Sequence, residues 1–331
     1  MTKSAAPIAA PAIPLRLTVC CAVFFSFLVS SALGETLRDR IRERRAQKTE
    51  LAAHPEESDE TSPTLQHVPG NVRRLPDIAY GSDAAQRLDI YLPASTPPKN
   101  APILFMVHGG GWARGDKAMQ TVVENKVAHW VPRGFIFVSI NYRLLPAARP
   151  LEQADDISRA LAYVQTHAKD WGGNPESVVL MGHSAGAHLV ALLAAQPKRA
   201  VDLGAKPWLG SVLLDSAALD VPAIMEKRHF RLYDPAFGKD PAYWKLASPY
   251  HLLTAPAQPV FAVCSSRRAD SRAQARSFAA HAKSIGSAVT VHEEDKTHRE
   301  INDELGLTGP YTEAVDAFLR SLSPSLAEEL R

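Results

Sequence analysis

Short, nearly continuous apolar runs recur along the chain, each bounded by residues that favour turns. Runs of this length are typical of strands that are buried on both faces of a sheet. An earlier segment, Gln86–Pro93, alternates apolar and polar residues, which predicts a half-buried strand. The predicted buried strands are Ile103–Gly109, Phe135–Tyr142, Ser177–Ser184, Ser211–Ser216, Pro259–Ser265 and Ala288–Glu293.

Helical patterns fill most of the segments between these runs. Strands that alternate with helices predict an α/β fold with a mostly parallel central sheet and helices on both of its faces. In open sheets of this kind, sites gather at the carboxyl ends of the strands, which is where chemistry should be sought. The predicted helices are Ala118–Trp130, Leu151–Ala168, Ala185–Ala195, Ser271–Ile285 and Tyr311–Leu322.

The segment Asp220–Leu253 interrupts this alternation. It is rich in aromatic, proline and charged residues and has no clean helical period. Two interpretations stay open, a surface excursion and a small cap over the strand ends.

The N-terminal residues predict export. Lys3 and Arg16 precede an apolar stretch, Leu17–Val29, that runs into small residues, which is the layout of a signal peptide. We therefore expect residues 1–34 to be a signal peptide that is cleaved before Glu35, giving a periplasmic or secreted protein with no stable membrane insertion. An uncleaved anchor helix is the alternative, although the stretch is short for a full span.

Residues 35–70 mix charges of both signs with few apolar residues and then become rich in acidic residues and proline. This composition predicts a short exposed charged helix followed by a flexible linker. The folded domain is then predicted to span residues 71–331.

Composition narrows the classes of partner. The chain has 331 residues, 46% of them hydrophobic, and a formal net charge of +2, which suits a globular core and no nucleic-acid partner.

Of its 3 cysteines, Cys20 and Cys21 lie in the predicted signal peptide, so Cys264 would have no disulfide partner in the mature chain. Because Cys264 ends an apolar run, we predict a buried and inert thiol.

The sequence GHSAG, Gly182–Gly186, lies between a predicted strand and a predicted helix. It fits the G-x-S-x-G pattern, in which a sharp strand-to-helix turn exposes a nucleophilic serine. Gly182 and Gly186 would leave the room that such a turn needs, which explains glycines where helix propensity opposes them. Ser184 is therefore the candidate nucleophile.

The sequence HGGGW, His108–Trp112, directly follows another predicted strand. Successive glycines let the backbone turn its amides inward, as an oxyanion hole requires. The alternatives are a flexible turn and a phosphate loop, but the Lys-Ser or Lys-Thr pair of a phosphate loop is missing. The candidate oxyanion donors are the amides of Gly109, Gly110 and Ala185.

A serine nucleophile needs an imidazole to take its proton, and the expected chain order is serine, acid, histidine. His298 lies after the last predicted strand, within residues 293–302, which are predicted to form a loop. This position at the carboxyl end of a strand favours it as the base. His292, which lies within the strand pattern, is the alternative.

For the acid, Asp270 follows the strand that ends near Cys264, and its position after the penultimate strand favours it. An ordinary helix N-cap is the plainer interpretation of this residue. Asp215 and Asp295 are the competing candidates. The neighbouring Arg267 and Arg268 have no assigned role beyond solvated surface charge.

These motifs, together with NYRL (Asn141–Leu144) and THREIN, resemble the α/β-hydrolase fold and, more narrowly, the hormone-sensitive-lipase-like carboxylesterases. That branch includes bacterial feruloyl and acetyl esterases and kynurenine formamidases. The resemblance covers about residues 80–322. It implies Ser184 as nucleophile, Asp270 as acid and His298 as base. The sequence departs from the family around Asp270, where the acid comes later after the strand than in many relatives.

The resulting hypothesis is a secreted serine hydrolase that needs no metal or cofactor and cleaves short-acyl or aryl-acyl esters, including those on sugars, through an acyl-enzyme. Trp112 and Tyr142 are candidates for lining the substrate pocket, with a place in the core as the alternative. An arylformamidase-type amidase and a non-catalytic binding module are the competing functions. The sequence does not give the oligomeric state.

Overall fold

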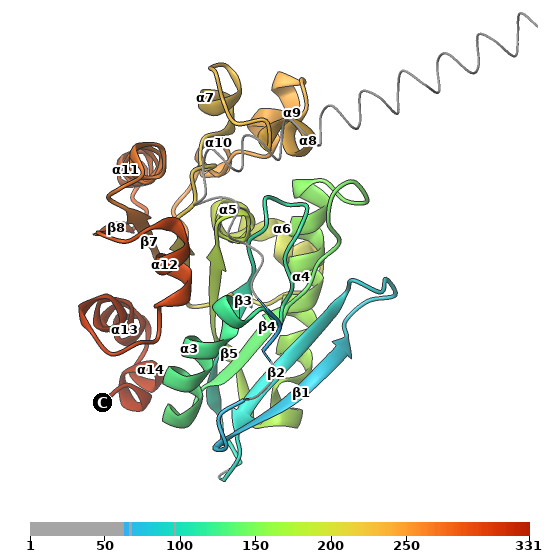
Figure 1. The fold of residues 1–331 in the computed structure, drawn as a ribbon, viewed down its shortest axis with the longest axis vertical. Coiled ribbons are helices and arrows are strands. Elements are labelled where there is room, and N and C mark those ends of the chain that lie inside the picture. The colour runs from blue at the N-terminus through green and yellow to red at the C-terminus, as the bar shows by residue number, and fades with distance from the viewer. Residues whose placement is uncertain (1–62, 66–67, 96) are drawn as a thin grey trace, which may run out of the picture. The chain divides into compact units, whose positions relative to one another are not determined.

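The apolar runs form the centre of an eight-stranded sheet in the computed structural model, which describes residues 63–331 except 66, 67 and 96 (Figure 1). Its strand order is β1-β2-β4-β3-β5-β6-β7-β8, in which β1–β2 and β2–β4 pair antiparallel and all later pairs are parallel. The strands are β1 (Val72–Ala79), β2 (Arg87–Pro93), β3 (Ala101–Val107), β4 (Ile136–Ile140), β5 (Gly173–His183), β6 (Gly210–Leu214), β7 (Val260–Ser265) and β8 (Val289–Glu294).

Helices cover both faces of the sheet, and alternate residues of each central strand enter one of two apolar layers. Ile103, Phe105 and Val107 of β3 pack on the face covered by α4, α5 and α11, whereas Leu104 and Met106 pack on the face of α3 and α13. This mostly parallel sheet between two helical layers confirms the predicted fold class. The principal helices are α3 (Gln120–Trp130), α4 (Pro150–His167), α5 (Ala185–Ala195), α11 (Ala269–Ser284) and α13 (Pro310–Leu322).

The edge strand β1 was not expected from the sequence. Its sequence, VRRLPDIA, is largely polar and most of its residues are partly or fully exposed, so it has no apolar run to mark it. Packing also extends N-terminally of residue 71, because Leu65 is buried and its amide bonds to Ala118 O at 2.7 Å.

Shorter helices were missed as well. They contain few buried residues, and periodicity is weak over a single turn or two. They are η1 (Val131–Arg133), η2 (Ala168–Trp171), α6 (Pro197–Asp202), α12 (His298–Asp303) and α14 (Pro324–Glu329).

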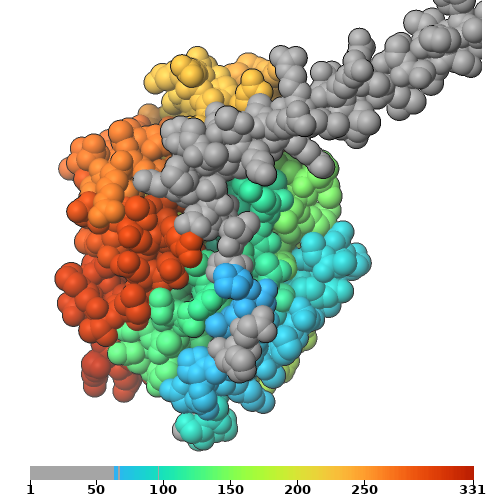
Figure 2. Space-filling model, viewed as in Figure 1, coloured from blue at the N-terminus to red at the C-terminus, as the bar shows by residue number. Residues whose placement is uncertain are grey.

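The segment predicted as a surface excursion or cap folds into four short helices: α7 (Val221–Met225), α8 (Tyr233–Phe237), α9 (Pro241–Leu246) and α10 (Pro249–Leu252). Figure 1 shows them together on one side of the molecule, next to α5, and Figure 2 shows them in yellow and light orange at that end of the described surface. Because α5 follows β5 directly, this is the side of the strands' carboxyl ends.

The predicted signal peptide lies outside the described residues, as does most of the predicted charged helix and linker. Among the helices that the structure does describe, none combines the length and the apolar character needed to cross a membrane.

Candidate active site

Ser184 occupies the sharp turn that the GHSAG pattern predicts. It connects β5 to α5 with φ 53° and ψ −119°, a left-handed φ that non-glycine residues rarely adopt. A Cβ atom on Gly182 would overlap the carbonyl oxygen of Gly186, and one on Gly186 would overlap that of Val107. The two glycines are therefore required by close backbone approach, as expected.

The turn leads directly into a buried helix. The amide of Ser184 donates to Leu214 O at 2.9 Å, which ties the turn to the end of β6. Ala185 is the first residue of α5, so its N–H has no acceptor within the helix. Every residue of α5 is buried, which fixes the direction of these first amides.

His298 is the first residue of α12, where the sequence had suggested a loop. The Thr297 side chain accepts from the amide of Glu300, and the Glu300 side chain accepts from the amide of Thr297, which forms a capping box. His298 is buried, and its Nδ1 lies 2.6 Å from Oδ2 of Asp215. Since a carboxylate only accepts, Nδ1 carries the hydrogen and Nε2 is left as the ring's basic nitrogen.

Asp215 immediately follows β6, is fully buried, and receives two hydrogen bonds on each oxygen. The Ser265 amide (2.8 Å) and the Ser271 hydroxyl (2.5 Å) donate to Oδ1, and His298 and Arg268 (2.8 Å) donate to Oδ2. Burial alone would raise the pKa of Asp215, but His298, Arg268 and the Ser265 amide outweigh it and hold that pKa well below its usual range. The carboxylate is therefore ionised.

Asp270, the acid favoured by the sequence, does not contact His298 in the structure. It lies in the first turn of α11, about half exposed, with its carboxylate 3.3 Å from Nη2 of Arg268. The assignment of Asp270 as the partner of His298 is thus corrected to Asp215, one of the two alternatives. The physical reason is that the turn after β7 brings an arginine, not a carboxylate, to the imidazole.

The remaining candidates lie outside this cluster. His292 of β8 bonds to Glu294 at 2.7 Å and is partly exposed. Asp295 is exposed and pairs with Arg267 at 2.8 Å, which agrees with surface charge for Arg267. Arg268 does not fit that expectation, because only 10% of its side chain is exposed.

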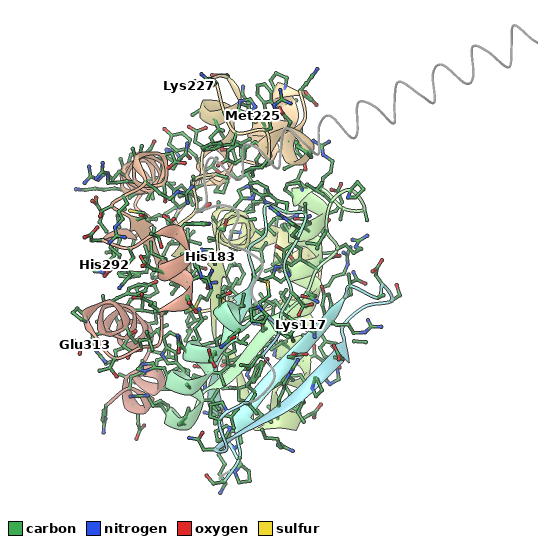
Figure 3. The ribbon with its side chains drawn as sticks, in the orientation of Figure 1. Lys117, His183, Met225, Lys227, His292 and Glu313 are labelled. Atoms are coloured by element: carbon green, nitrogen blue, oxygen red, sulfur yellow. The ribbon has the colours of Figure 1, made fainter. Side chains whose placement is uncertain are left out.

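His183, which directly precedes Ser184, links the turn between β5 and α5 to the first residue of α12. Its Nε2–H donates to the carbonyl of His298 at 3.0 Å, and the centroids of the two rings lie 4.4 Å apart, with the rings tilted by 36°. Figure 3 shows His183 between α5 and α12. Burial, followed by the neighbouring His298, lowers the pKa of His183 well below its ordinary value, so the ring is neutral. No sequence motif predicts this role for His183.

The HGGGW loop folds tightly beside the turn. Gly110 has φ 119°, and a Cβ there would overlap Arg114 O, so the glycine is required. Tyr142 is buried, stacks on the His108 ring at 4.6 Å, and donates its hydroxyl hydrogen to His108 O at 2.9 Å. These contacts place Tyr142 in the core, beneath the loop. A place in the core was the alternative to lining the substrate pocket.

Trp112 is likewise buried, in an aromatic cluster with His188, Tyr233 and Phe237. Its indole N–H donates to Nδ1 of His188 at 3.2 Å. Because the indole nitrogen can only donate, Nε2 of His188 carries the ring hydrogen and donates to Ala247 O at 2.8 Å. The loop, α5 and the segment before α10 are thus joined through one neutral imidazole.

Cys264 is buried in β7, as predicted, and burial raises the pKa of its thiol to about 11. A thiol that stays protonated is a poor nucleophile. Within the described part of the chain, no group of three or more His, Cys, Asp or Glu side chains is arranged to hold a metal ion.

The strand order and the two helical layers are those of the α/β-hydrolase fold, which solved structures of esterases share. Esterase B from Lactobacillus rhamnosis superimposes with a TM-score of 0.66 at 18% identity, over 91% of this chain and 96% of that one. A truncated carbohydrate esterase from gut microbiota gives a TM-score of 0.64 at 17% identity, over 82% and 99% of the two chains. A structure of the Lactobacillus enzyme inhibited by a tributyrin phosphonate, at 19% identity, gives 0.67 over 89% and 97%.

Comparison of amino-acid sequences also finds similarity to esterases. The family model described as BD-FAE matches residues 88–206. Esterase LipQ of Mycobacterium tuberculosis is 31% identical over 70% of this chain and 58% of its own length. Isoprenylcysteine alpha-carbonyl methylesterase ICME of Arabidopsis thaliana is 34% identical over 36% of this chain and 27% of its own. Both relatives are named as esterases, and the chain spans less than two thirds of the length of each.

Proposed function

We propose that this protein is a serine hydrolase that cleaves carboxylic esters through an acyl-enzyme, with Ser184 as nucleophile, His298 as base and Asp215 as acid. The observation that carries the proposal is the 2.6 Å contact between His298 Nδ1 and Asp215 Oδ2. These residues follow β8 and β6, at the edge of the sheet where the Ser184 turn follows β5. The names of the relatives, which are esterases, agree with it.

The geometry suits this chemistry step by step. Asp215 fixes the tautomer of His298, so that Nε2 can take the hydroxyl proton of Ser184 as the oxygen attacks the ester carbonyl. The amides of Gly109, Gly110 and Ala185 are the proposed donors to the resulting oxyanion. His298 then returns the proton to the leaving alcohol, and water releases the acid in a second cycle of the same kind.

The proposed substrates carry short acyl or aryl-acyl groups on an alcohol or a sugar. The segment Asp220–Leu253 supports this choice, because its four helices have four to six residues each and offer no large apolar lid for a lipid chain. Export from the cell, which the N-terminal sequence predicts, is part of the same proposal.

The test compares turnover of p-nitrophenyl acetate, an acetylated sugar and N-formylkynurenine by the purified chain, with fluorophosphonate labelling of Ser184. We expect ester turnover and labelling that the Ser184→Ala variant loses. A strong preference for the formamide would favour an amidase instead. No labelling of a chain that circular dichroism shows to be folded would contradict an enzymatic function.

A further inference from the structure

Arg268 occupies a position in the site that the proposed chemistry does not explain. It follows β7 and precedes α11, at the same edge of the sheet as Ser184, Asp215 and His298. Its Nη1 lies 2.8 Å from Asp215 Oδ2 and 2.8 Å from His298 Nδ1. Its Nη2 lies 3.3 Å from the exposed carboxylate of Asp270, which anchors the other end of the guanidinium.

The hydrogen-bonding capacities of these groups fix what the contacts mean. A guanidinium only donates, and Nδ1 of His298 already carries a hydrogen directed at Asp215. The arginine and the imidazole therefore share one acceptor oxygen, Asp215 Oδ2, and lie side by side as two donors. A permanent positive charge thus adjoins the ring that must accept a proton during catalysis.

This arrangement has two opposite electrostatic effects. The guanidinium stabilises the ionised form of the buried Asp215, which keeps the acid able to orient His298. It also disfavours a second positive charge on the imidazole, because like charges at this distance repel in a buried site. Loss of the arginine should therefore favour a positive charge on the imidazole and so lower activity at acidic pH.

We propose that Arg268 is a positioning residue of the hydrolase site, which holds Asp215 against His298 and extends the active range of the enzyme toward acidic pH. The proposal rests on the proposed function in naming His298 as the base. It assigns the arginine a role in the pH range of the reaction, and it assigns Asp270 the role of holding the arginine.

Other titratable groups surround the imidazole and must be separated from this effect. His183 of β5 lies against the ring at a tilt and is neutral, because burial lowers its pKa. Lys126 of α3 bonds to the carbonyl of Asn302 in α12, and burial lowers its pKa to about 7. Glu300, in the first turn of α12, faces Arg267 at 3.4 Å. All of these stay in place in an Arg268 variant, so a comparison of variants isolates the arginine.

The experiment measures kcat/KM for p-nitrophenyl acetate from pH 4.5 to 9 in the full chain and in the Arg268→Gln, Arg268→Lys and Arg267→Gln variants. In Arg268→Gln we expect the acid limb of the profile to move upward by about one pH unit. Arg268→Lys keeps the charge but not the forked geometry, so its acid limb should stay near that of the parent while its plateau falls. Arg267→Gln, a change in the exposed neighbour, should match the parent in both respects.

A second readout does not depend on turnover. The NMR titration of the His298 ring should show protonation at lower pH in the parent than in Arg268→Gln, whether or not the chain cleaves the chosen ester. Identical titrations would overturn the proposal, as would an Arg268→Lys variant whose acid limb moves as far as that of Arg268→Gln. Failure of the proposed function would appear separately, as a parent chain without turnover or labelling at Ser184.

Discussion

Ser184 and Asp215 stand at equivalent points of adjacent parallel strands. The register pairs His183 with Leu214, so that each of these two residues comes directly after the last paired residue of its strand, and each has a φ of 53°. The two strained positions present a hydroxyl and a carboxylate at the same edge of the sheet. His298, which follows the last strand, completes the arrangement by contacting the carboxylate.

The first prediction compares the two candidate acids, each replaced by asparagine. Asp215→Asn should lower kcat/KM about a thousandfold or more, because an amide no longer enforces the imidazole tautomer that leaves Nε2 basic. Asp270→Asn, which alters an exposed side chain bonded to Arg268, should cost far less. Steady-state kinetics on one ester decides the matter. Equal losses in the two variants would contradict the assignment of Asp215.

The glycines around Ser184 provide the second prediction. Gly186→Ala would force a Cβ atom against the carbonyl oxygens of Val107 and His108, so we expect a loss of stability of about 1–3 kcal/mol or more and a loss of turnover. Gly70→Ala is the matched control, since nothing lies within 4 Å of the added atom. Urea unfolding measures both. A Gly186→Ala variant as stable and active as Gly70→Ala would show that the turn is not tight.

The third prediction concerns Tyr142. If this residue supports the oxyanion loop from beneath, Tyr142→Phe removes one buried hydrogen bond, to His108 O, and should lower kcat several-fold by a similar factor for every ester. If it lines the substrate pocket instead, KM should change and the change should depend on the acyl group. Kinetics on acetyl, butyryl and aryl-acyl esters distinguish the two roles.

The fourth prediction concerns pH and stability. Burial lowers the pKa of His188 from 6.5 to about 4, so the unfolded chain takes up a proton at a higher pH than the folded chain does. The contribution of neutral His188 is complete above pH 6.5 and is lost as pH falls toward 4, by about 3 kcal/mol in total. The indole N–H of Trp112 would then face a protonated ring that cannot accept its hydrogen bond.

Urea unfolding at pH 7, 5.5 and 4 tests this linkage. The free energy of unfolding of the parent should fall more steeply with acidification than that of His188→Gln, although the variant should be less stable at pH 7. His183 and His108, whose pKa values burial also lowers, are retained in both proteins and cancel in the comparison. Parallel pH dependences would contradict the prediction.

Much of the fold followed from periodicity because the central strands are buried on both faces and consist almost wholly of apolar residues. The predicted α5, Ala185–Ala195, coincides with the observed helix for the same reason. The exposed edge strand β1 could not be found in this way. The helix α12 could have been, because THRE at Thr297–Glu300 is a capping-box pattern.

The site was predictable where chemistry and local conformation coincide in a motif, and less so elsewhere. Gly182, Ser184 and Gly186 carry their geometry in their spacing. The partner of His298 depended on which strand end approached it, and that is decided by tertiary packing of the turn after β7. No sequence pattern distinguishes Arg268, which is buried there, from its neighbour Arg267, which is exposed.

The aromatic contacts of Trp112 bear on how substrate range could change in this protein. Tyr233 and Phe237 of α8 pack on the indole that belongs to the same loop as the proposed oxyanion donors, and the carbonyl of Ala247 accepts a hydrogen bond from His188 of α5. The four-helix segment is therefore packed against the elements that carry the proposed site and is not a detachable lid. Residue changes in α8 that admit a different ester should alter turnover together with selectivity, so the two properties would have to evolve jointly.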